Sequence, residues 1–271
     1  MKTLKNHVIL FDNECPMCYA YTKAFVKTGM LAKGGRTAYQ EMPHDICPLV
    51  DRQRSANEIA LLNTENGEVT YGIQSLFKII ANAMPFFKPL FMFSPFIYLM
   101  QKFYAFISYN RKVIIPAAVK ENTIQPTFKI HYRIAYLLFT WLVTAYILTG
   151  YAHLLTDFVP LGSKYREYLI CGGQLFFQVA IIIFYRKEKL WDYLGNMMTI
   201  SFAGSLLLLP MLVLAKYFDV QPVFFILYFL MVAGLMFLEH IRRSKLLKLG
   251  WLMSISWAFY RLMVLGLIFL L

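Results

Sequence analysis

The spacing of apolar residues changes along this chain, and the change divides it into two parts. Up to about residue 80, short apolar runs alternate with polar turns, whereas long apolar stretches follow one another beyond Arg133. Short runs between turns predict an α/β domain, and stretches of about 20 residues predict membrane-spanning helices. We therefore expect an α/β domain over residues 1–115, a linker over 116–133 and an all-α membrane domain over 134–271.

The first part predicts the element order β-α-β-(α)-β-β-α. Its apolar runs are rich in β-forming residues, and its helical segments carry apolar residues at helical spacing. Gly29 is a plausible end for the first helix, and Asn66-Gly67 has the chemistry of a hairpin turn. The expected strands are residues 8–11, 36–40, 59–62 and 68–71, and the expected helices are 19–28 and 73–84, with a loop and short helix over 44–57.

About five transmembrane helices are expected in the second part, over residues 134–155, 168–185, 197–215, 222–238 and 251–271. Lysine and arginine gather before the first stretch, between the second and third, and between the fourth and fifth. Because such loops stay in the cytoplasm, we expect a multi-pass protein of the inner or plasma membrane. The same rule places the N-terminal domain in the cytoplasm.

Residues 85–107 match neither pattern. They are rich in Phe, Met and Tyr, yet they contain Lys88, Lys102 and three prolines. Two interpretations stay open. The segment is either part of an interfacial connector over residues 85–115 that lies against the membrane, or a helix packed on the α/β domain.

The composition supports a membrane protein and argues against nucleic acid as a partner. Hydrophobic residues make up 59% of the chain and charged residues 15%, and the formal net charge is +12. An ordinary soluble domain has about 25% charged residues. The basic residues cluster between hydrophobic stretches, which membrane topology explains better than nucleic-acid binding does. The lipid bilayer is therefore the first expected partner.

The sequence Cys15-Pro16-Met17-Cys18 lies where the first strand passes into the first helix. At a helix N-terminus, free N–H groups and the helix dipole favour an anion, so Cys15 can ionise more easily than an ordinary thiol. Cys18 is close enough to resolve a mixed disulfide, and Pro16 suits the first helical turn. This arrangement predicts a redox-active dithiol.

The string Asp12-x-x-Cys15-x-x-Cys18 resembles the DCC family of thiol-disulfide oxidoreductases, named for these three residues. The resemblance extends to about residue 115 and includes Asn66-Gly67, Tyr71-Gly72 and Tyr109-Asn110-Arg111. It implies a thioredoxin-like fold and dithiol–disulfide exchange, with Cys15 as the attacking thiol, Cys18 as the resolving thiol and Asp12 as a nearby acid. No cofactor beyond the dithiol is required, and the partner would be a thiol or disulfide of a protein or small molecule. One departure is that residues 55–58 lack the proline that thioredoxin folds place before their third strand.

Other interpretations of these residues stay open. Asp12 is either a group that accepts a thiol proton or an N-cap of the helix. The spacing His44-x-x-Cys47 offers two more ligands, so Cys15, Cys18, His44 and Cys47 could instead form a metal site.

Polar residues in the expected spans suggest a third class, a quinone-handling or transport protein with a regulatory redox domain. Arg261 falls near the middle of the last span, where an arginine is costly and faces a partner or a water-filled cavity. It could bind an anionic or quinone-like group, or pair with a carbonyl of the bundle. Cys171 is expected to be a packing residue beside Gly172 and Gly173.

Overall fold

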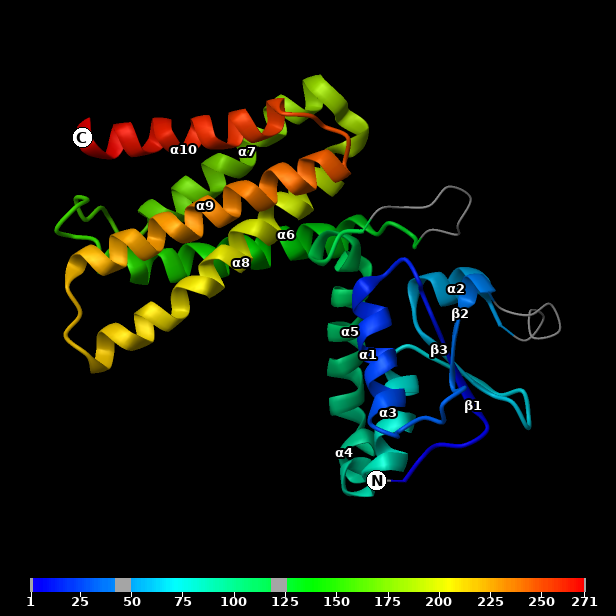
Figure 1. The fold of residues 1–271 in the computed structure, drawn as a ribbon. Helices are drawn as coiled ribbons and strands as arrows, with labels where there is room; N and C mark the ends of the chain where they lie inside the picture. The colour runs from blue at the N-terminus through cyan, green and yellow to red at the C-terminus, as the bar shows by residue number, and fades with distance from the viewer. Residues whose placement is uncertain (1, 42–49, 118–125, 271) are drawn as a thin grey trace. The chain divides into compact units, whose positions relative to one another are not determined.

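A computed structural model describes residues 2–41, 50–117 and 126–270 of the chain (Figure 1). The chain divides into two compact units, Met1–Tyr132 and Arg133–Leu271. This division falls at the end of the linker that the sequence predicts.

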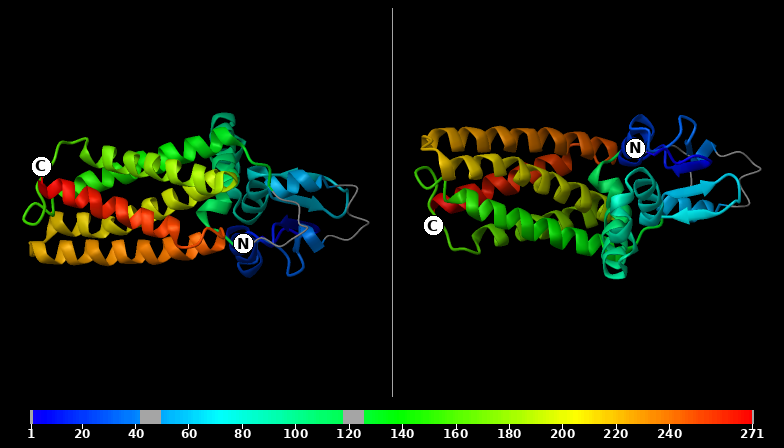
Figure 2. Two further views of the ribbon diagram at one scale, coloured as in Figure 1. Left: turned by 90° about the horizontal axis from the view of Figure 1, so that it is seen from above. Right: turned by 90° about the horizontal axis from the view of Figure 1, so that it is seen from below.

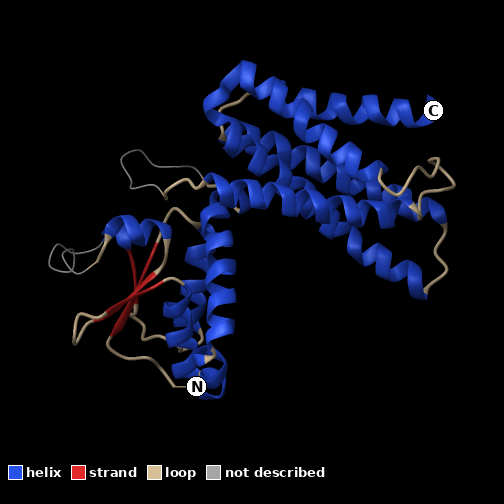
Figure 3. Cartoon of the chain, turned by 180° about the vertical axis from the view of Figure 1, so that it is seen from behind, coloured by secondary structure: helices blue, strands red, loops and turns tan. Residues whose placement is uncertain are grey.

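The first unit contains a four-stranded mixed sheet, drawn in red in Figure 3. The strands lie in the order β2-β1-β3-β4. β1 pairs in parallel with β2 and antiparallel with β3, and β4 pairs antiparallel with β3. The strands are β1 His7–Phe11, β2 Arg36–Ala38, β3 Ala60–Asn63 and β4 Val69–Tyr71.

Helices cover both faces of this sheet. Successive residues of a strand point to opposite faces, so Ile9 and Phe11 lie on one face and Leu10 on the other. The first pair packs with α1 Pro16–Lys27 and α3 Ile73–Ala83, whereas Leu10 packs near α2 Arg52–Asn57. Because both faces are buried, β1 is a continuous apolar run and not an alternating one.

Local sequence signals mark where several of these elements begin or end. The first helix finishes before Gly29, whose φ of +74° is the left-handed conformation common after a helix. The β3–β4 hairpin closes at Asn66-Gly67, and Gly67 has a φ of +73°. Asp51 caps α2 by accepting the N–H of Arg54 at 2.9 Å.

Residues 85–114 form a bent helical segment that packs on the first unit with one face. It consists of a 3₁₀ turn η3 Pro85–Phe87, α4 Lys88–Met92 and α5 Ser94–Ile114, with an angle of 89° between its two arms. Phe91 and Phe96 stack on Phe77 of α3 with ring centroids 4.2 and 5.8 Å apart. Other apolar residues of the segment, including Met92 and Leu99, are largely exposed. The helix therefore packs on the domain and also presents an apolar surface.

The second unit consists of long apolar helices that lie side by side in a bundle (Figure 2). They are α6 Ile130–Ala152, α7 Arg166–Arg186, α8 Leu190–Tyr217, α9 Pro222–Leu246 and α10 Leu252–Leu270. The sequence predicts that the first of them begins at residue 134, whereas it begins four residues earlier, at Ile130.

By length and apolar character alone, four or five helical stretches of the described residues could cross a membrane. Among the described residues, four continuous helical stretches are long and apolar enough, and the bent pair α4–α5 would be a fifth if it formed one span. The longest stretch, Arg166–Tyr217, has 52 residues and includes the 3₁₀ turn η4 Lys187–Lys189. At 1.5 Å per residue it is more than twice as long as a bilayer core is thick, and its halves α7 and α8 contact each other. It is therefore two helices of the bundle.

We predict that Gly72→Ala destabilises the first unit more than Gly29→Ala does. Gly72 has φ +64° and ψ −141°, a region that only glycine adopts readily. A Cβ there would also lie 2.9 Å from Oε2 of Glu58, whereas a Cβ on Gly29 meets no atom within 4 Å. Thermal unfolding of the two full-length variants measures the difference. Equal losses would contradict the steric argument.

Candidate functional site

Cys15 and Cys18 lie at the start of α1, directly after the turn that follows β1. Cys15 is the N-cap residue, with extended backbone angles of φ −99° and ψ 105°. Its Sγ accepts the backbone N–H of Cys18 at 3.3 Å, and Pro16 occupies the first turn. Both sulfur-bearing side chains are buried. The sulfur of Cys15 thus takes the place that a capping oxygen takes in other helices.

The hydrogen bond between the two thiols shifts their pKa values in opposite directions. A hydrogen bond from the Cys18 side chain is the largest of the effects that lower the pKa of Cys15 to about 7, and the positive charge of Arg111 acts in the same direction. Burial opposes both effects. The same hydrogen bond, together with burial, raises the pKa of Cys18 well above its ordinary value. Near neutral pH, Cys15 is therefore the thiolate of the pair and Cys18 the thiol.

Arg111 of α5 forms a buried ion pair with Asp12. Its Nη2 lies 2.8 Å from Oδ2 of Asp12, and the two side chains are only 4% and 5% exposed. The other carboxylate oxygen of Asp12 accepts the N–H of Glu14 at 3.0 Å and the side-chain amide of Gln40 at 2.9 Å. Asp12 therefore orders the turn before α1. It is not the N-cap of the helix, as one interpretation of the sequence expected, because Cys15 takes that position.

The face of α5 that carries Arg111 also holds the segment before β3. The guanidinium donates to the carbonyl oxygens of Ala56 and Asn57. Ser108 donates to the Asn57 carbonyl as well, and the hydroxyl of Tyr104 accepts the N–H of Ile59 at 3.0 Å. Tyr104, Ser108 and Arg111 are spaced four and three residues apart, so they lie on one side of the helix. These side chains hold residues 56–59, which lead into β3.

Of the three residues Tyr109, Asn110 and Arg111 that carried the resemblance, only Arg111 reaches the dithiol site. Tyr109 stacks on Tyr132, and Asn110 donates to the carbonyl oxygens of Phe106 and Tyr132.

Gln40, Tyr104 and Arg111 all belong to the site, although the sequence patterns described above predict a role for none of them. The sequence does contain one signal that points to Arg111. Arg111 ends an acid-free, apolar segment, and it follows a serine and a tyrosine at helical spacing. A cation in such a setting needs a buried acid as a partner, and Asp12 was available.

The metal alternative is not tested by the structure. His44 and Cys47 lie outside the described residues, and among the residues that are described no group of three His, Cys, Asp or Glu side chains could hold a metal ion. Cys15 and Cys18 are both free thiols.

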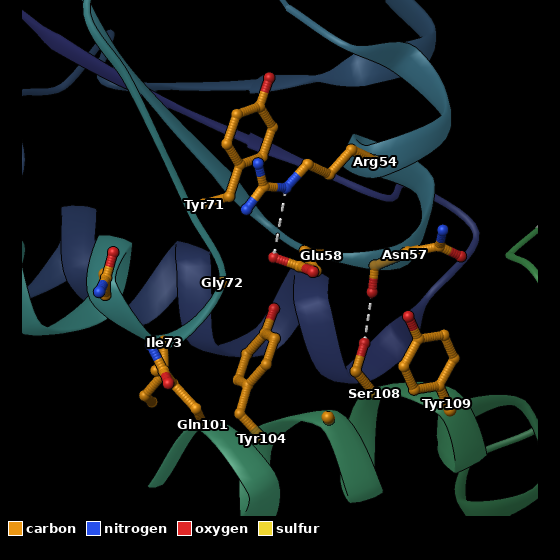
Figure 4. A pocket seen from close by; sticks show the side chains of 12 residues that line it. Arg54, Asn57, Glu58, Tyr71, Gly72, Ile73, Gln101, Tyr104, Ser108 and Tyr109 are labelled. Carbon is orange, nitrogen blue, oxygen red and sulfur yellow. Dashed lines mark hydrogen bonds and ion pairs between the residues drawn. The ribbon is translucent and has the colours of Figure 1, made fainter. Parts of the chain in front are cut away.

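A pocket of about 220 Å³ opens beside the segment before β3 (Figure 4). Tyr71, Tyr104 and Tyr109 line it together with the ion pair of Arg54 and Glu58. The side chain of Tyr104 also packs against the buried cluster that contains Cys15 and Cys18. This tyrosine therefore separates the pocket from the dithiol.

In the second unit, Arg261 lies on α10 with its guanidinium 4.4 Å from the ring centre of Trp257. Cys171 is buried in α7 beside two glycines that allow close packing. A Cβ on Gly172 would lie 2.5 Å from the Trp141 ring. Cys171 is thus in a tightly packed part of the bundle, as the sequence predicts.

Comparisons with protein-family models, with curated proteins and with solved structures find no match for this chain.

We predict that Asp12→Asn destabilises the first unit by about 3–5 kcal/mol, because it leaves the Arg111 guanidinium buried without a counter-charge. Arg54→Met, which breaks the exposed pair with Glu58, should cost only about 0.2–1 kcal/mol. Hydrogen exchange of the β1 amides in the full chain reports both free energies. The prediction fails if the two variants lose similar protection.

The alkylation rate of Cys15 should rise with pH through a midpoint near pH 7, following the pKa of its thiol. Replacing Cys18 by Ala removes the largest stabilising hydrogen bond and should move the midpoint upward. Iodoacetamide labelling followed by mass spectrometry, in a Cys47→Ser, Cys171→Ser background, gives the profile. A midpoint that is unchanged by Cys18→Ala would show that another group sets this pKa.

Proposed function

We propose that this protein is a membrane-anchored thiol–disulfide oxidoreductase with a thioredoxin-like N-terminal domain of the DCC type. The observation that carries the proposal is the pairing of an N-cap cysteine with a lowered pKa and a second cysteine with a raised one. A pair of thiols that are both inert would not be expected to differ in this way. The element order and the strand order β2-β1-β3-β4 are also those of a thioredoxin-like core.

The proposed reaction is a pair of thiol–disulfide exchanges. The Cys15 thiolate attacks one sulfur of a substrate disulfide, forming a mixed disulfide and releasing the other sulfur as a thiolate. Cys18 then loses its proton and attacks the Cys15 sulfur, which forms the Cys15–Cys18 disulfide and releases the second substrate thiolate. Two electrons pass from the dithiol to the substrate. In the reverse direction the same steps oxidise a substrate dithiol.

Two groups near the cysteines, Arg111 and Asp12, have proposed roles in this reaction. The charge of Arg111 stabilises the thiolate of Cys15, and it favours ionisation of Cys18 as well. The Asp12 carboxylate, which is already ordered by Arg111 and Gln40, is the nearby acid–base group that we assign to the Cys18 proton. No cofactor is needed for these steps.

The second unit anchors the domain, and we propose that the domain faces the cytoplasm. The basic loops of the chain support this orientation. The exposed apolar face of α4 and α5, which includes Met92, Phe93, Leu99 and Phe103, is proposed to rest in the membrane interface. Residues 69–120 contain no Asp or Glu, so nothing acidic on this segment opposes contact with anionic lipid.

Replacing Cys18 by Ser should trap the mixed disulfide on Cys15, because the resolving thiol is missing. Replacing Cys15 by Ser should reduce exchange to the uncatalysed rate, and Cys171→Ser should leave exchange unchanged. Non-reducing gels and mass spectrometry of the full chain with a model disulfide distinguish these outcomes. Exchange that survives Cys15→Ser would overturn the oxidoreductase assignment.

A membrane-impermeant maleimide tests the topology. We expect Glu65→Cys to react in inverted vesicles only and Lys164→Cys to react in right-side-out vesicles only. Leu99→Cys should react slowly in both until detergent is added, although its side chain is exposed in the structure. Fast labelling of Leu99→Cys in inverted vesicles would mean that this face lies in water.

A further inference from the structure

The membrane bundle contains a small cavity lined by four helices, α6, α8, α9 and α10. Its volume is about 30 Å³, which is roughly the volume that one water molecule occupies in the liquid. Apolar side chains of α8 and α9, including Leu208 and Val232, form part of its wall. Polar side chains from α6 and α10 line the cavity as well. A few polar side chains therefore meet at a cavity whose lining is otherwise mostly apolar.

Three of the lining side chains carry hydrogen-bond donors without acceptors. Oγ1 of Thr144, Nε1 of Trp257 and Nε of Arg261 are buried and have no hydrogen-bond partner among the residues that the structure describes. Thr144 and Trp257 are only 2% and 3% exposed. Thr140 and Thr149 of the same helix behave differently, because their hydroxyls donate to carbonyls one turn earlier. An unpaired donor inside a membrane is costly, and three at one cavity indicate a missing acceptor.

The charge of Arg261 is not balanced locally. Within the described part of the chain, no carboxylate lies within 4 Å of its guanidinium. Glu167 is the acid that interacts with it electrostatically, but the Glu167 carboxylate already pairs with Arg166 at 2.8 Å. A water molecule could accept hydrogen bonds in the cavity, but it would leave the positive charge uncompensated. A bound anion would satisfy the donors and the charge together.

We propose that this cavity is a binding site for a small monovalent anion of the halide class. The donors of Thr144, Trp257 and Arg261 would surround the ion, and the guanidinium would neutralise its charge. The proposal does not depend on the dithiol of the first unit.

Trp257 provides a reporter for the test. The full-length protein, purified without chloride in gluconate, is titrated with sodium iodide at constant ionic strength while tryptophan fluorescence is followed. The chain has four tryptophans, so a site beside Trp257 should give a saturable component of about a quarter of the signal. Exposed Trp251 should add a component that stays linear in iodide. Chloride should compete with the saturable component and should raise the thermal unfolding midpoint relative to gluconate.

Matched variants identify the donors. Arg261→Met and Trp257→Phe should remove the saturable component, whereas Arg186→Met, at an exposed arginine, should keep it. Thr144→Val should weaken iodide binding by about five- to tenfold, the loss of one hydrogen bond, and Thr140→Val should not. If Arg261→Met does not fold, the threonine pair still decides the question.

The proposal is overturned if quenching is linear throughout, if the saturable component survives Arg261→Met, or if gluconate stabilises the protein as well as chloride does. Any of these results would mean that the cavity holds only water.

Discussion

The buried ion pair between Asp12 and Arg111 is the interaction on which the first unit depends. It joins the end of β1 to a helix that begins more than 80 residues later, and the same guanidinium holds the carbonyls before β3. A buried charge without its partner is strongly unfavourable, so neither residue can be lost alone. Because Asp12 orders the turn that leads to Cys15, the ion pair also fixes the position of the two cysteines.

The chemistry of the site follows from an unequal division of hydrogen bonds between two cysteines. The sulfur of Cys15 accepts a hydrogen bond from the backbone N–H of Cys18, as an N-cap side chain does, and the positive charge of Arg111 also lowers its pKa. Cys18 lies one turn further into the helix and is held as a thiol. One short motif thus contains two thiols of different acidity, because the start of a helix offers different environments at successive turns.

The sequence predicted the parts of this site that depend on local signals. The Cys-x-x-Cys motif, Pro16, Gly29 and the Asn66-Gly67 turn each carry a conformational preference of their own, and the structure places them accordingly. The sequence marks the partner of Asp12 only indirectly, by an arginine at the end of an acid-free segment, because a contact over 99 positions leaves no periodic pattern. The bent helix after residue 85 was ambiguous for a different reason. It packs on α3 through aromatic residues, as one interpretation expected, and it also exposes apolar residues such as Met92 and Leu99. Its contact with a membrane stays a prediction.

The most direct test of the account is a redox titration of the full-length protein by thiol trapping, with the metal content determined on the same sample. The account predicts a reversible two-electron transition in metal-free protein, and it predicts that Cys15→Ser abolishes this transition. Thiols that stay masked until a chelator is added would instead indicate a metal site that includes Cys15 and Cys18, and they would contradict the oxidoreductase assignment.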